Sequence, residues 1–232
     1  MWKIDHACAW LFVCLSLVIA HAAFALPPPP QSWQHDIDRL VADDSAHPPP
    51  QHGVLFVGSS SIRMWTTLAA DFPGVPVIDR GFGGSTIADA TYFADRIVIP
   101  CHPRLIVMYA GDNDIAEGRT PQQVLDDAFK AFVARVRDAL PDVAIAYVSI
   151  KPSVARRSLW PAMHEANRRI AAWSQTQSRM TFVDVATDML DAKGDPRSAL
   201  FREDGLHMTP AGYAIWVRAL KPVLAHYGFT TH

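Results

Sequence analysis

The chain has 232 residues, half of them hydrophobic, and a formal net charge of -2 at pH 7. This length and apolar content predict one globular domain with a sizeable core. The balanced charge lacks the basic excess that is typical of nucleic-acid-binding proteins, so we expect no nucleic-acid partner.

Residues 1–25 have the pattern of a secretory signal peptide. Lys3 precedes an apolar stretch at residues 9–20, and Ala23 and Ala25 place small side chains where a signal peptidase cleaves. The apolar stretch is shorter than the roughly 20 residues of a membrane span, although a retained helical anchor is the alternative interpretation. We therefore expect an exported protein, periplasmic or secreted, with no stable membrane span after the signal is removed.

The three cysteines predict no disulfide within the exported chain. Cys8 and Cys14 would leave with the signal, and Cys101 would remain as the only thiol. Because Cys101 lies at the entrance to an apolar strand, a small buried residue is a better interpretation than a nucleophile.

Residues 26–51 are rich in proline, with one run at residues 27–30 and another at residues 48–50. The segment between the runs has helical character from residue 33 to residue 42. This pattern predicts a tether, a first helix that packs on the domain and a stiff connection into the first strand. The main domain is then expected at residues 52–230.

Strand-like and helix-like segments alternate through the main domain. The apolar runs predict five buried parallel strands, at residues 54–57, 75–78, 105–109, 143–148 and 181–185. Amphipathic stretches predict helices at residues 62–71, 87–95, 121–140, 160–176 and 210–227. Thr120 with Gln123 forms a predicted capping box, and Thr209 is a predicted cap of the last helix. The alternation predicts an α/β fold with three layers, whose functional loops lie beyond the carboxyl ends of the strands.

Ser60 lies between the first predicted strand and the first helix of the main domain. A serine at the amino end of a helix faces unpaired N–H groups, which favour the negative charge that develops in acyl transfer. Ser59, Ser60 and Ser61 could also act simply as helix caps, for which serine is a preferred residue.

His207 is the best candidate for the general base that a serine nucleophile needs. Asp204 precedes it by three residues in the same predicted loop, close enough to accept a hydrogen bond from one ring nitrogen. An Asp-x-x-His loop taken alone fits a local surface hydrogen bond equally well.

Two further segments can supply donors to a developing oxyanion. Gly84 lies in a glycine-rich loop after the second predicted strand, and Asn113 follows the third strand with a neutral side-chain amide. A glycine turn without a ligand would have the same sequence. Asp112 and Asp114 raise the alternative of a hard cation for phosphoester chemistry, although the neighbouring loops supply serine and glycine instead of further ligands.

Taken together, the segments at residues 58–62, 81–86, 111–114 and 204–207 resemble the four sequence blocks of the SGNH hydrolases, also called GDSL-type esterases and lipases. The match extends over nearly the whole chain after the signal. In detail the sequence is similar to the subgroup that includes lysophospholipases and platelet-activating-factor acetylhydrolase subunits. The resemblance implies a flavodoxin-like three-layer α/β/α sandwich without a metal or organic cofactor.

The resemblance also implies a role for each matching residue. Ser60 would be the nucleophile and a first oxyanion donor through its backbone N–H, Gly84 a second donor through its backbone, and Asn113 a third through its side chain. Asp204 and His207 would complete the catalytic triad. The Gly-Asp-Ser of the family pattern is Gly-Ser-Ser here, and Ser61 is the chief rival to Ser60 as the nucleophile.

The expected activity is hydrolysis of a small-molecule, lipid or sugar ester with a short acyl or acetyl group. Carbohydrate acetylesterase and lysophospholipase activities are alternatives within the same family. A catalytically inactive exported binding domain is the alternative from another functional class. The sequence leaves the oligomeric state open.

Overall fold

The computed structural model describes residues 33–230, so the predicted signal peptide lies outside the described residues. Five parallel strands form one sheet, in the order β2-β1-β3-β4-β5. Their bounds are Val54–Gly58 (β1), Val77–Gly81 (β2), Leu105–Tyr109 (β3), Ala144–Val148 (β4) and Met180–Val183 (β5). This is the flavodoxin-like strand order, so the predicted fold class is confirmed.

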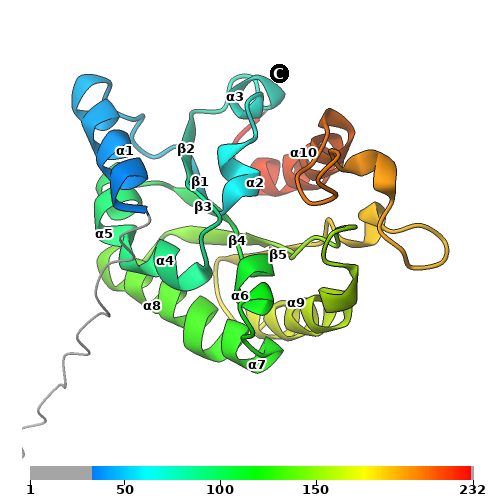
Figure 1. The fold of residues 1–232 in the computed structure, drawn as a ribbon. Coiled ribbons are helices and arrows are strands. Elements are labelled where there is room, and N and C mark those ends of the chain that lie inside the picture. Colours follow the sequence, from blue (N-terminus) through cyan, green and yellow to red (C-terminus); the bar gives the residue numbers. More distant parts are fainter. Residues whose placement is uncertain (1–32, 231–232) are drawn as a thin grey trace, which may run out of the picture.

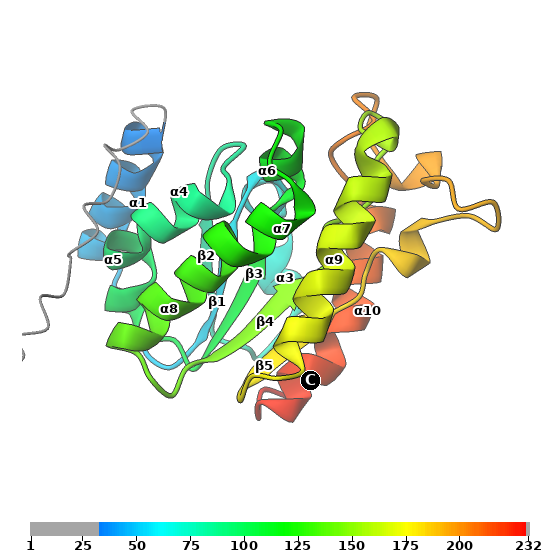
Figure 2. The ribbon, with the colours of Figure 1, turned by 90° about the horizontal axis from the view of Figure 1, so that it is seen from below.

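Helices cover both faces of the sheet, as Figures 1 and 2 show. One face carries α1 (Gln34–Ala46), α4 (Ile87–Tyr92), α5 (Ala94–Ile97), α8 (Lys130–Ala139) and α9 (Trp160–Ser174). The other face carries α2 (Ser60–Arg63), α3 (Leu68–Asp71) and α10 (Pro210–His226). Each face buries its own hydrophobic cluster, which gives the three layers.

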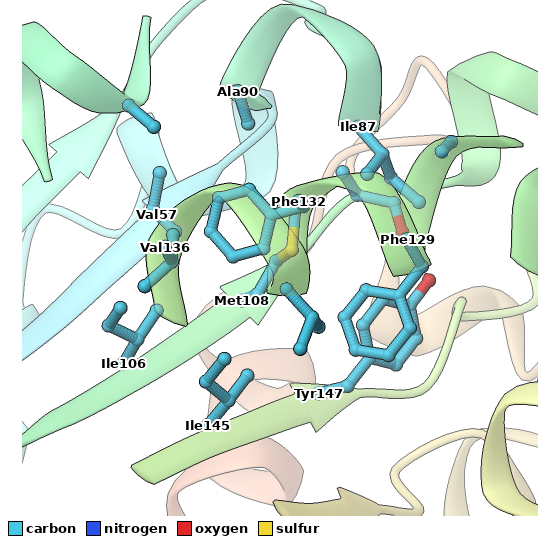
Figure 3. Close-up of a cluster of buried hydrophobic side chains, with 14 of the residues drawn as sticks. Val57, Ile87, Ala90, Ile106, Met108, Phe129, Phe132, Val136, Ile145 and Tyr147 are labelled. Atoms are coloured by element: carbon cyan, nitrogen blue, oxygen red, sulfur yellow. The ribbon is translucent and has the colours of Figure 1, made fainter. Parts of the chain in front are cut away.

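The central strands β1, β3 and β4 are buried along their whole length because helices cover both of their faces. Side chains alternate between the two clusters: Ile106 and Met108 of β3 face one, whereas Val107 faces the other. Figure 3 shows the first cluster, where Phe129 and Phe132 pack over strand residues. The rigid sheet fixes the positions of the loops at its carboxyl edge.

The observed elements differ from the predicted ones mainly at their ends. The helix expected at residues 62–71 is divided into α2 and α3, since the chain turns between them and buries both Trp65 and Leu68. The helix expected at residues 87–95 is likewise divided into α4 and α5. Strand β2 begins two residues later than expected, because Pro76 has no N–H and Val77 makes a tight turn to the Val75 carbonyl.

The helix expected at residues 121–140 is continuous but contains a π-helical turn. It runs through α7 (Pro121–Gln123), η3 (Val124–Phe129) and α8. The capping box of Thr120 with Gln123 is confirmed. Thr209 does precede α10, but its hydroxyl donates to the Ala199 carbonyl instead of capping the helix.

Among residues 33–230, no helix combines the length and apolar character that are needed to cross a bilayer. Cys101 is buried as expected, and burial raises the pKa of its thiol. The predicted first helix is present as α1, whose Ile37 side chain is fully buried against the domain.

Candidate active site

Ser60 is the first residue of α2 and follows a sharp turn at the end of β1. Gly58 has a φ of +135°, and a Cβ added to it would lie 1.9 Å from the Tyr109 carbonyl oxygen on β3. Only glycine permits this approach. The turn brings Ser60 to the carboxyl edge of the sheet, at the start of a helix too short for a large dipole.

The three adjacent serines have different environments. Ser59 and Ser61 are buried, with 1% and 2% of their surface exposed, whereas Ser60 is only half-buried. The Ser59 hydroxyl accepts a hydrogen bond from Asn113 Nδ2 at 2.8 Å. Ser60 is therefore the serine of the three whose hydroxyl a ligand can reach.

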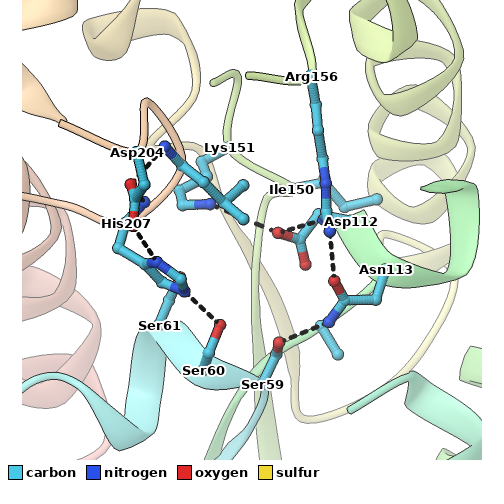
Figure 4. Close-up of polar contacts among 12 residues, drawn as sticks. Ser59, Ser60, Ser61, Asp112, Asn113, Ile150, Lys151, Arg156, Asp204 and His207 are labelled. Carbon is cyan, nitrogen blue, oxygen red and sulfur yellow. Dashed lines mark hydrogen bonds and ion pairs between the residues drawn. The ribbon is translucent and has the colours of Figure 1, made fainter. Parts of the chain in front are cut away.

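His207 lies beside Ser60 and is oriented by Asp204 (Figure 4). Ser60 Oγ is 3.1 Å from His207 Nε2, and His207 Nδ1 is 2.6 Å from Asp204 Oδ2. With Nδ1–H donating to the carboxylate, Nε2 is left as the acceptor for the serine hydroxyl. The arrangement can remove a proton from Ser60 as the hydroxyl attacks an electrophile.

The loop that holds this pair is fixed by its own backbone. The amides of Leu206 and His207 donate to Asp204 Oδ1 at 2.8 and 2.9 Å. The hydrogen bond from the His207 side chain, together with these amides, lowers the pKa of Asp204 to about 2. Asp204 therefore remains ionised across the neutral and mildly acidic range, where it can hold the ring.

Asn113 and Gly84 lie together beside the serines. Asn113 is in α6 (Asp112–Ala116), a helix that the sequence did not predict, and its Nδ2 also donates to the Ser85 carbonyl at 3.0 Å. A Cβ added to Gly84 would lie 3.6 Å from Asn113 Nδ2, and Gly84 itself is exposed. The structure thus brings the predicted oxyanion donors to the same edge of the sheet as Ser60.

The two carboxylates that flank Asn113 have separate partners. Asp112 Oδ2 lies 3.4 Å from Lys151 Nζ and 3.2 Å from Arg156 Nη1. Asp114 accepts a hydrogen bond from the Ile87 amide at the start of α4. Between residues 33 and 230, no group of three or more His, Cys, Asp or Glu side chains is placed to hold a metal ion.

Burial raises the pKa of Asp114 to about 6, although the Ile87 amide acts in the opposite direction. Its carboxylate links α6, which carries Asn113, to the helix that follows the Gly84 loop. Asp114 therefore ties together the two segments that contain the predicted side-chain and backbone donors.

Sequence reasoning missed the inward contacts of the loop after β4. Arg156 of this loop donates through Nη2 to Asn113 Oδ1 at 2.8 Å. Arg157 is 67% exposed and pairs with Asp195. Lys151 lies shortly after β4, where a lysine that follows a buried strand indicates a buried ion pair.

The aromatic residues Trp65, Phe82 and Trp160 divide between the core and the surface. Trp65 and Phe82 are fully buried core residues. Trp65 packs against Tyr213 and Trp216 of α10. Trp160 is half-buried at the start of α9 and packs against His164.

A family model described as the GDSL-like lipase/acylhydrolase family matches residues 52–215. No curated protein sequence matches the chain. Several solved structures have a similar fold. One is a Streptococcus pneumonia protein provisionally named a platelet activating factor, with 20% identity and a TM-score of 0.72 over 83% of this chain and 93% of that chain.

A GDSL-like lipase from Bacteroides thetaiotaomicron has 23% identity and a TM-score of 0.70, over 82% of this chain and 98% of that chain. A family 3 carbohydrate esterase from Clostridium thermocellum has 15% identity and a TM-score of 0.59, over 76% of this chain and 98% of that chain. At these identities the similar structures show a common fold.

Proposed function

Because this chain belongs to the GDSL-like lipase/acylhydrolase family and is an ester hydrolase, we propose that it cleaves short-chain acyl or acetyl esters with a triad of Ser60, His207 and Asp204. One observation carries the proposal. The His207 ring lies between its two partners, with Nε2 3.1 Å from Ser60 Oγ and Nδ1 2.6 Å from Asp204 Oδ2. Hydrogen bonds at both nitrogens are what a serine nucleophile with an oriented base requires.

The reaction proceeds in two steps. Ser60 Oγ forms a bond to the ester carbonyl carbon while His207 Nε2 takes its proton, and the carbonyl oxygen becomes an oxyanion. As the tetrahedral intermediate collapses, the bond to the alcohol breaks and His207 returns the proton to the leaving oxygen. Water, deprotonated by His207, then attacks the acyl-enzyme and releases the acid and Ser60.

The oxyanion would be bound by three donors: the backbone N–H groups of Ser60 and Gly84, and Asn113 Nδ2. Support comes from the exposed backbone of Gly84 and from the position of Asn113 Nδ2 beside it. Loss of one such donor typically lowers kcat by about 10²- to 10³-fold.

Two classes of substrate are proposed, which differ in the alcohol that carries the acyl group. An acetylated sugar is supported by the fold shared with the carbohydrate esterase. A lysophospholipid is supported by the sequence similarity to the lysophospholipase subgroup. Initial rates on nitrophenyl esters from acetate to palmitate, beside acetylated xylan and lysophospholipid, distinguish the two.

A fluorophosphonate probe tests the nucleophile directly. We expect labelling of the wild type at Ser60, no labelling of Ser60→Ala and weak labelling of His207→Ala. Ser61→Ala is the matched control, because Ser61 is the adjacent buried serine. Absence of labelling in folded wild-type protein would instead support a non-catalytic binding domain.

We also propose that the protein is exported to the periplasm or the medium, on the basis of the signal pattern in residues 1–25. Mass spectrometry of the protein from its native host tests this. The expected mature N-terminus is near Leu26, and an uncleaved chain in the cytoplasm would contradict the proposal.

A further inference from the structure

The Arg156 side chain contacts two residues beside the nucleophile (Figure 4). Its Nη2 donates to Asn113 Oδ1 at 2.8 Å, and its Nη1 lies 3.2 Å from Asp112 Oδ2. Only 20% of the side chain is exposed. Nη1 is buried and forms an ion pair with Asp112 without a hydrogen bond, so the Nη2 bond to Asn113 is the directional contact of the guanidinium.

Asp112 forms an ion pair with this guanidinium. Its side chain is only 6% exposed, so little water can solvate the carboxylate charge. The same oxygen lies 3.4 Å from Nζ of Lys151, which is 1% exposed. One buried carboxylate thus faces both Arg156 and Lys151, and burial lowers the pKa of the Lys151 ammonium although Asp112 acts in the opposite direction. The Asp112 carboxylate thereby fixes the guanidinium of Arg156 beside Asn113.

The carboxamide of Asn113 can present either its oxygen or its nitrogen to the serines. A guanidinium has donors only, so Arg156 can bond to Oδ1 and cannot bond to Nδ2. This contact directs Nδ2 toward Ser59 Oγ at 2.8 Å and the Ser85 carbonyl at 3.0 Å. Because these bonds use both hydrogens of Nδ2, the amide exchanges one of them when it donates to the oxyanion. A charged donor on Oδ1 also polarises the amide and strengthens its N–H as a donor.

We infer that Arg156 is a positioning residue, which fixes and polarises the Asn113 carboxamide as a donor to the oxyanion; the inference rests on the proposed function. Arg156 acts through Asn113 and does not itself contact the substrate. The competing role, recognition of an anionic headgroup, would need guanidinium nitrogens that are free to face the ligand.

The first test separates kcat from KM on a neutral ester, 4-nitrophenyl acetate. We expect Arg156→Ala to lower kcat by roughly 10- to 100-fold, less than or equal to the loss of a whole oxyanion donor, with little change in KM. The matched control is Arg157→Ala, which removes the adjacent exposed guanidinium and should leave kcat unchanged. Added guanidinium ion should restore part of the kcat of Arg156→Ala.

A double-mutant cycle provides the second test. If Arg156 acts through Asn113, the double variant Asn113→Ala/Arg156→Ala should be no slower than Asn113→Ala alone. Rate losses that multiply would overturn the inference. So would a variant that keeps its kcat on the neutral ester and raises KM only for a phosphate-bearing ester.

Thermal unfolding of each variant shows whether a change in kcat or KM is caused by loss of the fold. If Arg156→Ala does not fold, Arg156→Lys is measured instead. Lysine keeps a cation opposite Asp112 but loses the guanidinium that contacts Asn113 and Asp112 together. The variant should show the same kcat-only decrease, and wild-type kcat in Arg156→Lys would overturn the inference. Full activity of Ser60→Ala would refute the proposed function itself, which the Arg156 variants do not test.

Discussion

His207 Nε2 lies 3.1 Å from Ser60 Oγ although 147 positions separate the two residues in the chain. Ser60 is fixed by the turn after β1, and His207 by the hydrogen-bonded loop before α10. The two loops meet because β1 is central in the sheet and α10 packs across the same face as α2.

The first prediction uses this contact. If Ser60 and His207 act as one unit, the double alanine variant should be no slower than either single variant, each with kcat lowered roughly 10⁴- to 10⁶-fold. Steady-state rates on 4-nitrophenyl acetate measure this. His226→Ala, an exposed histidine of α10, is the control and should keep full activity. Multiplying losses would argue that the two side chains act independently.

The second prediction concerns pH and Asp114, whose folded pKa of about 6 lies above its ordinary value of 3.8. Between these values the folded state binds more protons than the unfolded state, so the free energy of unfolding falls as pH rises from about 4 to about 6. This difference in pKa corresponds to about 3 kcal/mol. Asp114→Asn keeps an acceptor for the Ile87 amide, but its free energy of unfolding should lose this dependence on pH.

Urea unfolding at pH 4, 5 and 7 checks that expectation. The stability of Asp114→Asn relative to the wild type should improve as pH rises. Asp142→Asn is the control, because its side chain is 90% exposed. Parallel pH profiles for the wild type and Asp114→Asn would show that burial of this carboxylate is not penalised.

The third prediction tests the turn that presents Ser60. Gly58→Ala places a Cβ 1.9 Å from the Tyr109 carbonyl oxygen at a positive φ, and should cost roughly 3–5 kcal/mol of stability together with the activity. Gly118→Ala is a matched control, since its φ is +92° but nothing lies within 4 Å of the added Cβ. It should cost only about 1–2 kcal/mol. Equal losses in chemical unfolding would mean that backbone strain, not the clash, decides the effect.

The fourth prediction concerns the attachment of α1 to the domain. Asp44 of α1 lies 2.5 Å from the guanidinium of Arg80, whose side chain is 7% exposed. Asp44→Ala leaves that charge without its carboxylate and should lower the free energy of unfolding by roughly 1–3 kcal/mol.

The control for α1 is Asp36→Ala, which breaks an ion pair with Arg39, whose side chain is 63% exposed. Its expected cost is about 0.5 kcal/mol or less. A negligible effect of Asp44→Ala in the same unfolding experiment would show that α1 is attached by its apolar face alone.

Much of the fold was predictable from local patterns. Buried parallel strands have continuous apolar runs, so β1, β3 and β4 were found close to their true bounds. The capping box at Thr120 was also predictable, because its two hydrogen bonds join residues three apart. The short helix α6 was missed, since its first turn carries polar residues that serve the site and its apolar pattern is short.

The sequence by itself determined the order of strands and helices and the residue types that could perform ester hydrolysis, because periodicity and motif spacing are local properties. Only the tertiary structure decided which of three adjacent serines is accessible and which partners Asp112, Asp114 and Arg156 take. Those choices depend on burial and on side chains that approach from distant loops. In particular, the contact of Arg156 with Asn113 joins residues 43 positions apart, and no spacing rule along the chain specifies it.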